Sequence, residues 1–102
     1  MYVSVSHLRV DPDVAADVIT AFRGRARLVE AHDGFIDLQV WQSETDDGEI
    51  MMVSRWKSRA AFTAYMKSTD HAVSHARIDP AIQSAIRLER LEHLSGFEVV
   101  AE

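Results

Sequence analysis

The histidines of this chain are the side chains with the clearest capacity for chemistry. There are five of them and no cysteine, so thiolate metal sites, disulfides and iron–sulfur clusters are excluded and imidazole is left as the ligand for a borderline metal. His71 and His75 are four residues apart, which on a helix would place both rings on one face. This spacing leaves three interpretations open: two solvated histidines, a two-histidine metal site without a nearby carboxylate, or one histidine that binds heme iron axially.

The segment that contains these two histidines is rich in aromatic residues. Trp56, Phe62 and Tyr65 all precede them within 20 residues. No glycine-rich phosphate loop and no G-x-S-x-G motif is present, so phosphoryl transfer and serine hydrolysis have no support. A histidine that projects over an apolar pocket therefore remains the most specific chemical prediction. The residues expected to line that pocket are Phe22, Phe62, Tyr65 and Met66.

Composition and charge exclude several classes of protein. A chain of 102 residues with 47% hydrophobic and 26% charged side chains is typical of one globular domain, over 1–102. Eleven Lys and Arg against 16 Asp and Glu give a net charge of −5, and the basic residues are scattered, which argues against a nucleic-acid partner. No apolar run approaches the length of a membrane span, and the first ten residues alternate in polarity, so we expect a cytoplasmic protein with no membrane partner.

Hydrophobic periodicity predicts an alternation of strands and helices. Asp11-Pro12 and Ser58 are typical helix starts, and Asp47-Gly48 is typical of a hairpin turn. The predicted elements, in order, are a strand over 2–10, a helix over 12–31, strands over 35–42 and 50–56, helical segments over 59–67, 70–77 and 80–94, and a strand over 97–101.

This order predicts the fold class and a partner. A β-α-β-β-α-β chain with an extra helical segment before the last strand is an α+β, ferredoxin-like domain whose two crossover helices cover one face of an antiparallel sheet. Both faces of the predicted strands nevertheless carry apolar side chains, since Trp41 and Phe35 oppose Ile36, Leu38 and Val40. An apolar sheet face without helices is typical of a protein interface, so we expect a homodimer that packs sheet against sheet as a dimeric α+β barrel.

Four motifs are spread over nearly the whole chain. They are FRGRARLVE at 22–30, Asp33-Gly34-Phe35, SRWKS at 54–58, and FTAYMKS at 62–68 followed by AVSH at 72–75. Together they resemble the antibiotic biosynthesis monooxygenase (ABM) superfamily, and the first three are general to it. The fourth, with an aromatic residue ten positions before a histidine, is similar to the IsdG-type heme-degrading branch of that superfamily.

The resemblance implies roles for individual residues. His75 corresponds to the proximal heme ligand of that branch. His7 and His71 stay open as competitors for the iron. Tyr65 stands where the branch has a tryptophan that distorts the porphyrin. Ser6 or His7, depending on the strand register, stands where the branch has an asparagine that hydrogen-bonds the distal ligand. These two departures bear on turnover more than on heme binding.

The activity implied by the resemblance is oxidation of heme, which is both cofactor and substrate. Dioxygen and an external electron donor would open the porphyrin ring and release iron, and Arg25 matches a basic position that would bind the heme propionates. Two alternatives stay open. One is a cofactor-free ABM-type monooxygenase that oxidises a quinol or polyketide-like aromatic with His or Tyr as base, and the other is a non-enzymatic heme-binding dimer.

Overall fold

Four antiparallel strands form one sheet in the order β2-β3-β1-β4, in a computed structural model that describes residues 1–24, 28–69 and 91–102. This is the predicted ferredoxin-like α+β arrangement, with the two central strands separated in the sequence by a helix and a strand. The strands are β1 (Tyr2–Arg9), β2 (Phe35–Gln42), β3 (Glu49–Trp56) and β4 (Leu91–Glu98), the helices are α1 (Ala15–Arg23) and α2 (Arg59–Met66), and two 3₁₀ turns, η1 (Pro12–Val14) and η2 (Leu28–Ala31), flank α1.

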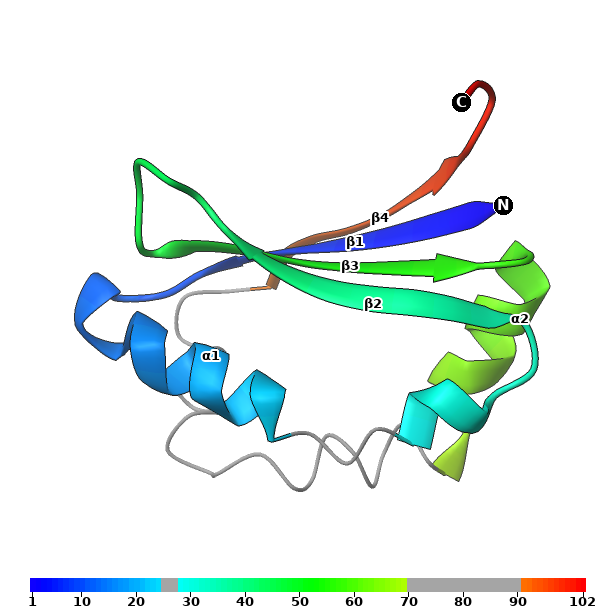
Figure 1. The fold of residues 1–102 in the computed structure, drawn as a ribbon, viewed down its shortest axis with the longest axis horizontal. Helices are drawn as coiled ribbons and strands as arrows, with labels where there is room; N and C mark the ends of the chain where they lie inside the picture. Colours follow the sequence, from blue (N-terminus) through cyan, green and yellow to red (C-terminus); the bar gives the residue numbers. More distant parts are fainter. Residues whose placement is uncertain (25–27, 70–90) are drawn as a thin grey trace.

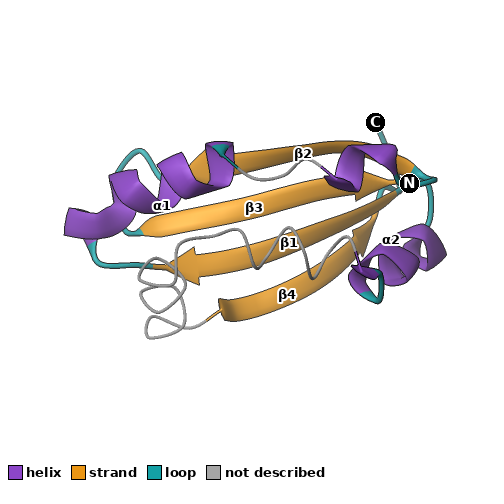
Figure 2. Ribbon diagram, turned by 90° about the horizontal axis from the view of Figure 1, so that it is seen from below, coloured by secondary structure: helices purple, strands orange, loops and turns teal. Residues whose placement is uncertain are grey.

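All the helical elements that the structure describes lie on one side of the sheet (Figure 1). Viewed from that side, α1 lies near one end of the strands and α2 near the other (Figure 2). The sheet therefore has a covered face, which carries Leu8, Val40 and Ile50, and an open face, which carries Val5 and Val53.

The covered face is packed in two separate hydrophobic clusters. Cluster A joins the sheet to α1, and cluster B joins it to α2 and η2. Cluster A consists of Leu8, Val10, Ala15, Val18, Phe22 and Ile50, and cluster B of Val29, Trp56 and Tyr65 with the partly buried Tyr2, Phe35, Ala61 and Phe62 around them.

The expected side of Phe35 was wrong. Strict alternation predicts Phe35 opposite Leu38 and Val40, but the pairing of β2 with β3 shifts register between Phe35 and Asp37. This irregularity turns Phe35 to the covered face, where its ring packs edge-on against Trp56 at a centroid distance of 5.3 Å. A one-residue insertion changes the face of every residue on one side of it, which simple alternation cannot anticipate.

The predicted helix start after Ser58 is confirmed, and the chain becomes helical after Asp11 as predicted, first as the 3₁₀ turn η1 and then as α1 from Ala15. The carboxylate of Asp11 accepts a hydrogen bond from the Asp13 amide at 2.9 Å, and the hydroxyl of Ser58 accepts one from the Ala61 amide at 3.2 Å, as N-capping requires. The predicted end of the first helix is wrong: α1 ends at Arg23, before the cap Gly24.

The last strand begins earlier than predicted. Leu91 and Leu94, assigned to a helix from their spacing, belong to β4, where they pair with Leu8 and Ser6 of β1. Pairing to a central strand outweighs the helical spacing, which is ambiguous for so short an apolar run. Gly96, which lies between the predicted helical segment and the predicted last strand, belongs to β4 as well. The other predicted helical segments, over 70–77 and 80–90, lie outside the described residues.

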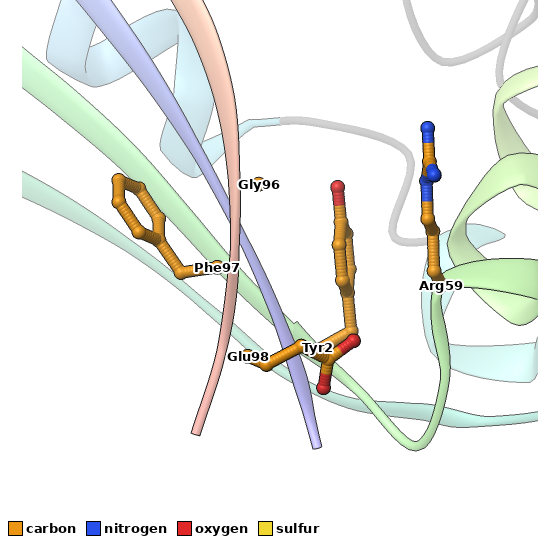
Figure 3. A pocket seen from close by; sticks show the side chains of 5 residues that line it. All are labelled: Tyr2, Arg59, Gly96, Phe97 and Glu98. Atoms are coloured by element: carbon orange, nitrogen blue, oxygen red, sulfur yellow. The ribbon is translucent and has the colours of Figure 1, made fainter. Parts of the chain in front are cut away.

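The open face exposes large apolar side chains. Ile36, Trp41 and Phe97 are 41%, 46% and 55% exposed, and the ring of Phe97 lies on the opposite side of β4 from Tyr2 (Figure 3). In the part of the chain that the structure describes, no helix combines the length and apolarity needed to cross a membrane.

Candidate functional site

A band of small residues crosses the covered face between the two hydrophobic clusters. Ser4 of β1 pairs with Ser54 of β3 on one side and with Gly96 of β4 on the other. Ser6 follows on the same face of β1, opposite Met52 of β3. Ser4 and Ser54 are both buried, so the centre of an otherwise apolar layer offers hydroxyl groups and little side-chain bulk.

A cluster of aromatic rings adjoins this band. The rings of Trp56 and Tyr65 are stacked, with centroids 5.5 Å apart and planes inclined by 30°, and Phe62 meets Trp56 edge-on at 5.7 Å. Trp56 is only 1% exposed, and its indole N–H donates a hydrogen bond of 2.9 Å to the Ser54 hydroxyl. This hydrogen bond connects the aromatic cluster to the band of small residues and fixes the orientation of the indole.

His32 joins the same cluster from the turn that follows η2. Its ring contacts Tyr65 edge-on, with centroids 4.8 Å apart and an interplanar angle of 76°. Tyr65 is 8% exposed, and its ring lies between the His32 imidazole and the Trp56 indole. This contact could not be predicted, because nothing in the spacing of residues 32 and 65 indicates that they meet.

The strand register distinguishes the two candidates on β1. Ser6 lies on the covered face with Ser4 and Leu8, whereas His7 lies on the open face, where it pairs with Met51 and with His93. Only Ser6 is therefore on the side of the sheet where Tyr65 and Phe62 lie. His7 is placed away from that side by the alternation of side chains along a strand.

The structure divides the four residues expected to line one pocket. Phe62 and Tyr65 lie together in cluster B, but Phe22 lies in cluster A. Met66, at the end of α2, is 37% exposed. Phe22 is separated from Phe62 and Tyr65 because it lies in the last turn of α1, which packs beside Leu8 and Ile50.

The remaining predicted residues lie outside the described residues: Arg25, His71 and His75. Their predicted roles in iron and propionate binding stay predictions. Within the described residues, no group of three or more His, Asp or Glu side chains converges in a way that could hold a metal ion.

Residues 1–77 match the family model described as antibiotic biosynthesis monooxygenase. The chain belongs to this family. The ABM domain is a monooxygenase domain, so the family supports the general activity, whereas the assignment to its heme-degrading branch rests on the sequence motifs alone.

Solved structures share the fold of this ABM domain. Rv0793 from Mycobacterium tuberculosis superposes with a TM-score of 0.73 at 16% identity, over 99% of this chain and 96% of that one. A variant of SnoaB, a cofactor-independent oxygenase from Streptomyces nogalater, gives 0.74 at 14% identity over 99% and 94%. A conserved protein from Methanosarcina mazei gives 0.68 at 14% identity over 94% and 87%.

At these identities the likeness establishes the fold and nothing finer. A search of curated proteins found no match. The chemistry of this ABM domain has to be argued from its own residues.

Proposed function

We propose that this ABM-family chain is a heme-degrading monooxygenase whose substrate lies against the covered face of the sheet. The observation that carries the proposal is that Ser6 and Tyr65, far apart in the sequence, lie on the same side of the sheet. These are the positions at which the heme-degrading branch has its distal hydrogen-bond donor and its ring-distorting aromatic residue.

The composition of the covered face fits a flat, largely apolar ring. Ser4 and Ser54 place two small side chains opposite each other on the central strands, with hydrophobic clusters on either side of them. A layer whose only task was stability would be expected to carry Val or Leu at these central positions. Local departures from that rule are typical of functional sites.

The chain's own residues would bind and orient the substrate. His75 would ligate the iron and Arg25 a propionate, as the sequence resemblance implies. The Ser6 hydroxyl would donate a hydrogen bond to dioxygen. Tyr65, held between His32 and Trp56, would present a rigid ring edge or face to the porphyrin. Bound heme would supply the iron that activates dioxygen and the carbon that is oxidised, with electrons from an external donor.

The test of this proposal is turnover of the hemin complex. Ascorbate and oxygen are added to the complex, and the Soret band and the release of chelatable iron are followed, with an anaerobic sample as control. The proposal predicts loss of the Soret band and release of iron only in the presence of oxygen. A complex whose spectrum survives aerobic reduction would contradict degradation and leave a heme-binding dimer.

The register of β1 supplies a matched pair of variants. Loss of one hydroxyl donor is worth about 1 kcal/mol, or roughly fivefold in rate. Ser6→Ala should therefore slow turnover about fivefold relative to the neighbouring substitution His7→Ala. A larger effect of His7→Ala than of Ser6→Ala would contradict the placement of the donor on the covered face.

A second candidate function is favoured by the contact between His32 and Tyr65. An imidazole against a buried phenol places a general base beside an aromatic pocket, as a cofactor-free ABM oxygenase acting on a quinol or polyketide-like aromatic would need. Oxygen uptake by the heme-free protein with a quinol substrate would support this candidate over the first.

We also propose that a second copy of the chain covers the open face. Trp41 of β2 and Phe97 of β4 are exposed on opposite edges of this face, with Val5 and Val53 between them on the central strands. One helix layer leaves this face without cover in the described chain. A symmetric dimer would bring the same surface of two copies together.

A further inference from the structure

A polar hollow lies beside the proposed site, between the edge strand β4 and the start of α2. Its volume is about 320 Å³, and it is lined by Tyr2, Arg59, Gly96, Phe97 and Glu98. The side chains of Tyr2 and Arg59 extend side by side, so that the phenol oxygen and the guanidinium lie at the same end (Figure 3). The Glu98 carboxylate lies at the other end, near the base of the tyrosine.

The position of the Tyr2 hydroxyl is fixed from two sides. A β carbon added to Gly96 would overlap that hydroxyl, so the glycine is what allows the phenol to lie across β4. On the other side the ring of Tyr2 contacts Phe62, with centroids 5.5 Å apart. The hydroxyl is therefore held at the border of the hollow rather than free in solvent.

The two hydrogen-bond donors of the hollow are unused within the described chain. Among the described residues, neither the Arg59 guanidinium nor the Tyr2 hydroxyl has a hydrogen bond or an ion pair. The one acidic group that lines the hollow, Glu98, is instead 4.0 Å from the N-terminal ammonium group. A guanidinium and a phenol that face the same space are a donor set suited to a carboxylate.

We propose that Tyr2 and Arg59 bind a carboxylate of the substrate, which under the proposed function is one of the two heme propionates. Tyr2 and Ser6 share the covered face of β1 four residues apart, about 13 Å along the strand. The Tyr2–Phe62 contact connects the hollow to the aromatic cluster. The inference rests on the proposed function and assigns a second propionate contact in addition to that predicted for Arg25.

The experiment compares hemin with hemin dimethyl ester, in which both propionates are neutral. Affinities are measured from the Soret absorbance in the same dilute detergent for the wild type, Arg59→Gln, Tyr2→Phe and Lys57→Gln. Lys57 is an exposed cation two residues before Arg59, so its substitution is a matched control for net charge.

We expect the wild type to bind hemin about tenfold more tightly than the diester, because a charge-assisted hydrogen bond contributes on the order of one decade in affinity. Arg59→Gln should reduce this preference by weakening hemin binding alone, leaving the part that Arg25 contributes through the other propionate. Tyr2→Phe should reduce it less, and Lys57→Gln should keep it.

Three results would overturn the inference while leaving the proposed function intact. They are equal wild-type affinity for hemin and its diester, an Arg59→Gln variant with unchanged affinity for both compounds, and an Arg59→Gln variant that loses affinity for both compounds equally. Absence of binding to either compound would overturn the proposed function, and this inference with it.

Discussion

The buried hydrogen bond between Trp56 and Ser54 permits a quantitative test of how the aromatic cluster is held. The indole N–H donates to the Ser54 hydroxyl at 2.9 Å, and Trp56 is 1% exposed. Ser54→Ala removes only the acceptor oxygen and leaves the indole donor without that partner in the core. Such a donor retains the cost of its lost hydration, about 1–3 kcal/mol.

The chain contains a natural control for this substitution. Trp41 donates to the side-chain carbonyl of Gln39, also two residues earlier on its strand and also at 2.9 Å, but Trp41 is 46% exposed. Water can replace the lost acceptor there, so Gln39→Met should cost less than about 0.5 kcal/mol. Both variants are compared with the wild type by urea unfolding, at a protein concentration at which sedimentation shows monomers.

For Ser54→Ala, a loss of about 2 kcal/mol corresponds to a fall in melting temperature of roughly 10 °C for a domain of this size. Its tryptophan emission should also shift relative to the wild type. Equal stability of Ser54→Ala and the wild type, or a larger cost for Gln39→Met, would refute the reasoning that burial makes the first hydrogen bond the important one.

Three further predictions concern other parts of the chain. Gly34 has a φ of +83°, so Gly34→Ala should lower the free energy of unfolding by at least about 1–2 kcal/mol. Gly24 has a φ of −85°, so the control Gly24→Ala should change it by less than about 0.5 kcal/mol. Similar losses for the two variants in urea unfolding would contradict this prediction. The Arg9 hydrogen bond lowers the pKa of Asp46 below its ordinary value of 3.8, so the ionised carboxylate stabilises the fold above that pH. The difference in unfolding free energy between the wild type and Asp46→Asn should therefore shrink as the pH falls from about 6 to about 2. A difference that stays constant with pH would contradict this prediction. Trp41→Glu should shift sedimentation toward monomers while leaving the circular dichroism spectrum intact, and an unchanged dimer would argue against the open face as the interface.

Local signals predicted much of the fold because each acts within a few residues. The caps Asp11 and Ser58 and the alternation along the first three strands identify the elements on which the sheet is built. The errors lie where a distant partner decides: Leu91 and Leu94 have a spacing compatible with a helix, and only their pairing with β1 makes them a strand. Phe35 changes face for a similar reason, since a register shift is a property of two strands together.

The candidate site was predictable only in part. The sequence indicated Tyr65 and Phe62 and left Ser6 and His7 as alternatives, because a shift of one residue in register exchanges the two faces of a strand. The register places Ser6 on the covered face and His7 on the open face. The contact of His32 with Tyr65 was not predictable, because it joins two segments that meet only after the sheet has formed.

The proposed function depends on heme binding through His75, which is measured by a hemin titration of the purified protein followed by the Soret band. The wild type and the control His93→Ala should form a stoichiometric complex with a ligated-heme spectrum, and His75→Ala should lose that spectrum and bind at least about tenfold more weakly. A wild type that takes up no hemin, or a His75→Ala variant with unchanged spectrum and affinity, would contradict heme binding through His75.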